Sequence, residues 1–152
     1  MYYKSLKDDK WGWTVYRTTY NNNDVQWAKF KDLITQYTAF QIHNIPDIHS
    51  QSIADTLEWT FMDDPATFNG ASRDFLRQHY RQLEKQLGRY LHSAFLQVDE
   101  EVLQSVTEET GEDWREQGLP GYIKLVNAYW KPQEEYFSSE DFPCDPEDVE
   151  KY

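Results

Sequence analysis

Arg17 is the residue whose chemistry stands out, because it lies inside the tryptophan-rich stretch WGWTVYRTTY, residues 11–20. An arginine in such a stretch must stack on an aromatic ring or pair with a carboxylate. Two interpretations stay open. Arg17 either reaches solvent beside Glu58 as a strand-end residue, or it is the anion-binding group of an aromatic pocket. In the second case His92 and Glu58 are the titratable groups that would act with it.

Histidine is the side chain that titrates near neutral pH, so each histidine is a candidate general base. The four are His43, His49, His79 and His92. His43 and His49 flank Asp47 but lack a third zinc ligand. His79 lies beside the apolar stripe of a predicted helix and is expected to pack there. His92 borders a predicted strand, where its ring could face a cleft.

The remaining groups match no catalytic pattern. Asp63 and Asp64, with Asn69, offer oxygen atoms to Ca²⁺ or Mg²⁺, but their spacing is not that of an EF-hand and Asp before Pro is common in turns. No serine lies in a nucleophile-elbow motif, and no glycine-rich phosphate loop is present. Cys144 lies among acidic residues, which would raise the pKa of its thiol. We therefore predict no metal and no cofactor.

Composition limits the classes of partner. The 152 residues carry a formal net charge of -12, which disfavours nucleic acids and anionic membranes but is compatible with a basic protein. The single cysteine excludes an intramolecular disulfide, and the start of the chain lacks the apolar run of a secretory signal. We expect a cytoplasmic protein with one domain, residues 1–131, followed by an acidic tail, residues 132–152.

Hydrophobic periodicity predicts the elements that must position these groups. Strands are expected within residues 11–20, 54–64, 95–98 and 121–130. Helices are expected at 25–37, 73–87 and 100–106, with Asp24, Ser72 and Asp99 as their N-caps. We interpret this order as an α+β domain with one four-stranded, mainly antiparallel sheet and helices on one face. A ferredoxin-like or dimeric α+β-barrel-like arrangement is the expected architecture.

The strand at residues 11–20 has bulky side chains on both sides. Trp11, Trp13 and Arg17 alternate with Tyr16 and Tyr20. If helices cover one face of the sheet, its other face must meet a ligand, a partner or the chain's own tail. Among the aromatic residues of that tail are Tyr136, Phe137 and Phe142.

The aromatic face is the predicted recognition surface. Its candidate residues are Trp11, Trp13, Arg17, Glu58, Trp59, His92 and Trp130. The leading hypothesis is a cytosolic, cofactor-free protein that binds a hydrophobic small molecule or a protein partner, with a face-to-face homodimer as one arrangement. The alternatives are a cofactor-independent enzyme acting on a hydrophobic metabolite and an acidic inhibitor of a basic protein. An RNA-binding sheet would also expose aromatic rings, but the net charge opposes it.

Two stretches also resemble a known group of proteins. WGWTVYRTTY, followed by a tryptophan-containing helix, and WTFMDDPATFNGAS, residues 59–72, are similar to uncharacterised intracellular proteins of filamentous fungi. The similarity covers roughly the first half of the chain. It implies a cytoplasmic, non-housekeeping role and carries no activity over to any residue.

Overall fold

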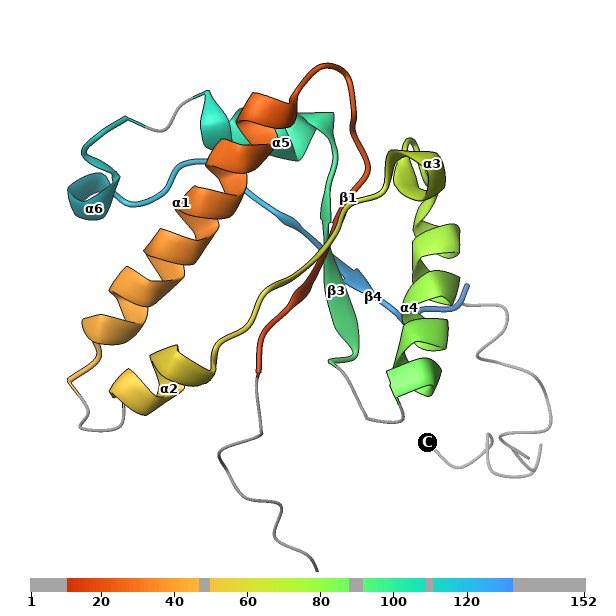
Figure 1. The fold of residues 1–152 in the computed structure, drawn as a ribbon, viewed down its shortest axis with the longest axis horizontal. Coiled ribbons are helices and arrows are strands. Elements are labelled where there is room, and N and C mark those ends of the chain that lie inside the picture. The colour runs from red at the N-terminus through yellow and green to blue at the C-terminus, as the bar shows by residue number, and fades with distance from the viewer. Residues whose placement is uncertain (1–10, 47–49, 88–91, 109–110, 133–152) are drawn as a thin grey trace, which may run out of the picture.

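The computed structural model describes residues 11–46, 50–87, 92–108 and 111–132, and shows one four-stranded sheet in the order β2-β1-β3-β4 (Figure 1). The strands are β1 (Thr14–Arg17), β2 (Thr60–Met62), β3 (Ala94–Val98) and β4 (Lys124–Asn127). Strand β1 pairs in parallel with β2 and with β3, and only the β3–β4 pair is antiparallel. The predicted mainly antiparallel sheet is therefore wrong. Helices connect the first three strands. Each helical connection brings the chain back to the end of the sheet where the previous strand began, so the next strand runs in the same direction.

Two helices follow each of the first three strands. They are α1 (Asp24–His43) and α2 (Ser50–Thr56), α3 (Pro65–Phe68) and α4 (Arg73–Leu87), and α5 (Glu100–Thr107) and α6 (Trp114–Gln117). The three predicted helices are confirmed. Residues 54–56, which were expected to begin a strand, instead end α2, which packs against α1.

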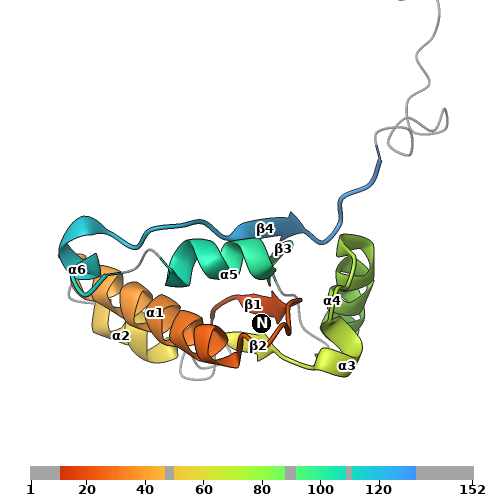
Figure 2. The ribbon, with the colours of Figure 1, turned by 90° about the horizontal axis from the view of Figure 1, so that it is seen from above.

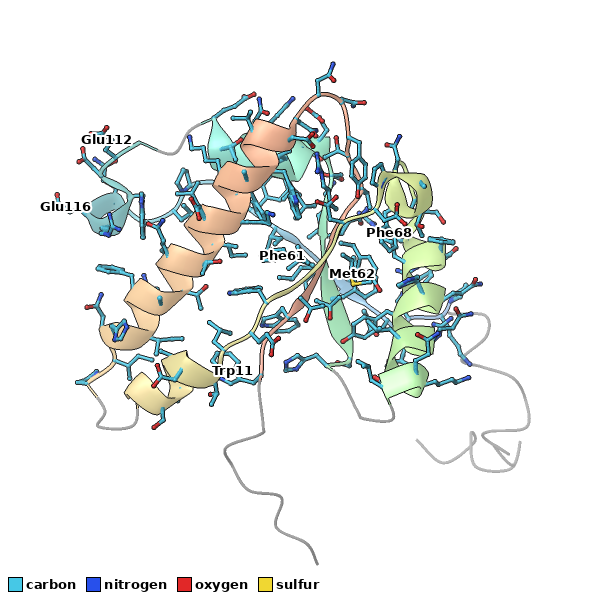
Figure 3. The ribbon with its side chains drawn as sticks, viewed as in Figure 1. Trp11, Phe61, Met62, Phe68, Glu112 and Glu116 are labelled. Carbon is cyan, nitrogen blue, oxygen red and sulfur yellow. The ribbon has the colours of Figure 1, made fainter. Side chains whose placement is uncertain are left out.

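The helices cover both faces of the sheet, with α1 and α4 on opposite sides (Figures 1 and 2). Val15 and Leu96 face the core formed with α1 and α5, whereas Tyr16 and Phe95 face the core formed with α4. Adjacent residues of β2 follow the same alternation: Phe61 packs with the first core and Met62 with the second (Figure 3). The expectation of helices on one face only is wrong, and all four residues of β1 are buried.

Side-chain caps explain where several helices begin. The Asp64 carboxylate accepts a hydrogen bond from the backbone N–H of Ala66 at the start of α3. Ser72 Oγ accepts one from Phe75, and Asp99 accepts one from Val102 at the start of α5. Helix α1 has no such side-chain cap, because Asn23, at its N-cap position, uses its side chain elsewhere. The predicted role of Asp24 as that cap is wrong.

Helix α4 is joined to the sheet by a polar contact inside its apolar core. The Tyr16 hydroxyl and His79 Nδ1 lie 2.8 Å apart, and the Tyr16 ring meets the rings of Phe68 and Phe95 edge-on. Burial raises the pKa of Tyr16 above its usual value and lowers the pKa of His79. His79 is therefore held in its neutral form more strongly in the folded protein than in the unfolded chain.

The lowered pKa of His79 predicts that the stability of the fold depends on pH. The folded pKa of His79 lies below the unfolded value of about 6.5, so the unfolded state binds a proton first as the pH falls. The contribution of His79 to stability is complete above about pH 7 and is lost progressively as the pH falls below 6.5.

Urea denaturation between pH 7.5 and 5.5 should show a smaller decrease in unfolding free energy for His79→Gln than for the wild type. His43→Gln, on an exposed helix position, is the control. Equal slopes for wild type and His79→Gln would contradict the prediction.

Candidate functional site

The carboxyl ends of β1, β2 and β3 meet at one edge of the sheet, because these strands are parallel. Arg17 is the last residue of β1, Asp63 follows β2, and Glu100 begins α5 directly after β3. This carboxyl edge is where open α/β sheets usually bind ligands, in the crevice where the strand order reverses. In this sheet the order reverses at β1: the chain continues from β1 to β2 on one side of it, and β3 then pairs with β1 on the other side.

The Arg17 guanidinium is buried at this edge and bonded by the protein itself. Arg17 is 3% exposed. Its Nε donates to the backbone oxygen of Thr19 at 2.8 Å, and its Nη2 donates to Asn23 Oδ1 at 2.8 Å and to Asp24 Oδ1 at 2.6 Å. Nη1 lies 3.4 Å from Asp63 Oδ1. Arg17 therefore lies at the end of its strand, but it is buried and pairs with Asp24 and Asp63 rather than reaching solvent beside Glu58.

Aromatic rings complete the surroundings of the guanidinium. Its central carbon lies 4.3 Å from the ring centroid of Tyr20 and 5.4 Å from that of Trp27. The Trp27 indole N–H donates to Asp63 Oδ2 at 3.0 Å. Asp63 thus bonds both the cation and one of the rings that contact it, which fixes all three side chains.

A second set of hydrogen bonds extends from this group to α5. Thr19 Oγ1 donates to Glu100 Oε2 at 2.5 Å, and Asn23 Nδ2 donates to the same oxygen at 2.9 Å. The bond from Thr19 is the largest cause that lowers the pKa of Glu100. Two carboxylates, Asp24 and Asp63, thus pair with the Arg17 cation, and a third, Glu100, is joined to this group through Thr19 and Asn23.

The opposite, amino edge of the sheet brings together four of the predicted aromatic residues. We define the amino-edge cluster as Trp11, Trp13, Trp59 and His92. The rings of Trp13 and His92 are stacked, with centroids 4.5 Å apart and planes inclined by 19°. Trp13 is half-buried, whereas His92 is exposed. The stack extends the core formed with α1 and α5 to the surface, because Trp13 and Trp59 both pack against that core.

Backbone pairing holds the rest of the amino edge in place. Trp11 forms an isolated parallel bridge with Leu57, and its indole N–H donates to the Ile53 oxygen at 3.0 Å. The backbone N–H of Glu58 donates to the Trp11 oxygen at 2.7 Å. Gly12 permits this approach: it has a φ of +154°, and a Cβ there would lie 1.9 Å from the Glu58 oxygen. Trp11 is 38% exposed and lies at the end of the molecule away from α5 (Figure 3).

Two of the predicted site residues lie elsewhere. Arg17 is at the opposite end of β1 from Trp13, about 13 Å away along the strand. Trp130 follows β4, and its ring lies under Arg77 of α4, 4.9 Å from the guanidinium carbon. The structure thus groups Trp11, Trp13, Glu58, Trp59 and His92, and it separates Arg17 and Trp130 from them.

Sequence reasoning missed the partners of Arg17. The signal that could have found one of them is positional: Asp63 lies near the end of the second predicted strand, and the ends of parallel strands meet. Asp64, proposed with Asp63 as a cation ligand, instead caps α3 and accepts from Thr67 Oγ1 at 2.6 Å. Within the described ranges, no group of three or more His, Cys, Asp or Glu side chains is arranged to hold a metal ion.

Several sequence predictions fall outside the described residues. They concern Asp47, His49 and, within the predicted tail, Tyr136, Phe137, Phe142 and Cys144.

Comparisons with known proteins add no functional assignment. No family model, curated protein or solved structure matches the chain. The resemblance to a group of fungal proteins stays a prediction. In the part of the chain that the structure describes, no helix is both long enough and apolar enough to span a membrane.

The Arg17 network predicts a large effect of neutral substitution. Arg17→Met should lower the free energy of unfolding by about 3–5 kcal/mol, because it leaves Asp63 and Asn23 without their cation. Arg73→Met is the matched control: Arg73 is an exposed arginine at the start of α4, so we expect a loss below about 1 kcal/mol. Urea denaturation of both variants tests this. A loss for Arg17→Met no larger than that of the control would mean that the network does not stabilise the fold.

Proposed function

We propose that this protein binds a flat, apolar small molecule at the amino-edge cluster. The observation that carries the proposal is the Trp13–His92 stack, whose outer member, His92, is exposed. A ring held by stacking on a half-buried tryptophan loses little conformational freedom when a planar ligand adds a further layer. The proposal keeps the predicted recognition by aromatic residues but moves it from the covered sheet face to this edge.

Two further features support the amino edge over the carboxyl edge. Trp11, 38% exposed and two residues before Trp13, adds a partly exposed indole to the amino edge, and exposed apolar patches often mark ligand-binding sites. At the carboxyl edge, by contrast, the Arg17 donors are occupied by Thr19, Asn23 and Asp24. An anionic ligand would have to displace these acceptors before it could bind Arg17.

The proposal describes a cytoplasmic binding protein that needs no cofactor. The location rests on the single cysteine and on the resemblance of the sequence to intracellular fungal proteins. The net charge of -12 makes a neutral or cationic ligand more favourable than an anionic one.

Titration with indole, a small planar probe, tests the site. Binding should shift the His92 ring signals in ¹H–¹³C spectra, with a dissociation constant on the order of 1 mM, as expected for a fragment of this size. Trp13→Ala should weaken binding at least about tenfold, because it removes the ring that holds His92.

Trp130→Ala is the matched control, because Trp130 is also an exposed tryptophan but lies beside Arg77. It should leave the indole affinity unchanged. Urea denaturation of Trp13→Ala separates loss of binding from loss of folding. Absence of any shift at His92, or equal weakening by Trp130→Ala, would rule out the proposed site.

A further inference from the structure

Helix α4 carries a line of positive charge on a protein whose formal net charge is -12. Its basic residues are spaced four positions apart and are Arg73, Arg77, Arg81 and Lys85. At 3.6 residues per turn, a spacing of four turns each position by only about 40° from the one before. The four side chains therefore start within about a third of the helix circumference. We call this line the α4 stripe.

The α4 stripe lies at an outer margin of the molecule. Helix α4 is at the opposite end from α6, and no described helix or strand lies beyond it (Figures 1 and 2). Leu76 and Tyr80 bury another side of the helix in the core that contains Tyr16. Arg73 and Lys85 are exposed at the two ends of the stripe. A partner can therefore approach the stripe without disturbing the core.

The two central arginines are oriented by the chain at the end of β4. Arg77 Nε donates to the Asn127 oxygen at 3.0 Å, and Arg81 Nη1 donates to the Ala128 oxygen at 2.6 Å. These carbonyl oxygens accept hydrogen bonds but carry no net charge that would neutralise the guanidinium groups. The stripe thus presents cations whose positions are already fixed, which lowers the entropy cost of binding an anion.

Few carboxylates offset the charge of the stripe. Among the residues that the structure describes, its one ion pair joins Arg77 to Asp74, whose side chain is 81% exposed, so solvent screens the pair. The other acidic residue of α4, Glu84, accepts a hydrogen bond from the Tyr129 hydroxyl. With four basic and two acidic residues, α4 keeps a positive surplus.

We propose that the α4 stripe binds an acidic, extended segment of a partner protein. Successive stripe positions are about 6 Å apart along the helix axis. In an extended chain, side chains on the same side are two residues and about 6.6 Å apart. Carboxylates at every second position can therefore meet the four cations in turn, and each guanidinium group can form charge-assisted hydrogen bonds with one of them.

An acidic peptide fits this surface better than a nucleic acid does. Helix α4 holds four of the 15 Lys and Arg residues but only two of the 27 Asp and Glu residues, so the rest of the protein is strongly acidic. A long phosphate polymer would extend beyond the stripe to this acidic remainder, where like charges repel. The stripe is about 18 Å long, which matches an acidic segment of about seven extended residues.

Fluorescence anisotropy with a labelled peptide of four Glu-Thr repeats tests the proposal. The full chain should bind it with a dissociation constant on the order of 100 µM at low salt, because exposed ion pairs are individually weak. Raising the salt from about 20 to 200 mM should weaken binding at least about fivefold, since salt screens exposed charges. A peptide of four Gln-Thr repeats, without charge, should not bind.

Charge reversal on α4 locates the site. Arg73→Glu and Lys85→Glu should each weaken binding at least about fivefold, because an anion replaces a cation at one end of the stripe. Arg115→Glu, at an exposed position of α6, changes the net charge equally and should weaken binding less than about twofold. Glutamate suits the first turn of a helix, so Arg73→Glu should leave α4 folded.

Three outcomes overturn the proposal. They are absence of binding to the wild type, binding of the Gln-Thr peptide with equal affinity, and equal weakening by Arg115→Glu. Binding that appears only after removal of residues 133–152, which contain eight acidic residues, also overturns it. That result would assign the stripe to an acidic segment of the same chain instead of a partner.

Discussion

The buried Arg17 guanidinium is the interaction on which the carboxyl edge depends. Withdrawing a cation from water costs several kcal/mol unless carboxylates and hydrogen-bond acceptors replace the solvent. Arg17 receives these from the start of α1 and from the end of β2, through Asn23, Asp24 and Asp63. Because Asn23 also bonds Glu100 of α5, the placement of two helices and two strands follows from one side chain. This explains why α1 begins without an ordinary side-chain cap: the residue that could supply it serves Arg17 instead.

The same network shapes where function can reside. Parallel sheets usually keep polar groups available at their carboxyl edge for a ligand, and this protein uses them for its own structure. The exposed rings of Trp11 and His92 lie at the opposite edge, where the strands approach closely through backbone contacts at Gly12. The proposed binding site and the Arg17 network thus lie at opposite ends of β1.

Much of the local structure could be predicted from the sequence, because it depends on near neighbours. The caps at Ser72 and Asp99 fixed where α4 and α5 begin. The direction of each strand depends on how the helices between the strands connect them across long stretches of the sequence. The alternating strands and helices favour a parallel sheet that is covered on both faces, whereas the aromatic residues of the first strand suggest an open face. The candidate residues were selected for their type. Their grouping required the register between β1 and β2, which pairs Thr14 with Thr60 and so places Trp13 beside Trp59.

The central position of β1 also affects the order in which the protein can fold. Val15 is paired with Phe61 on one side and with Leu96 on the other, so both neighbours of this strand lie far along the chain. Contacts of such long sequence separation slow folding. During synthesis, β1 is made first but gains its second neighbour only after residue 98 has been added. Until then, a newly made chain presents an apolar, half-paired strand to other nascent chains, and this is the stage at which aggregation would compete with folding.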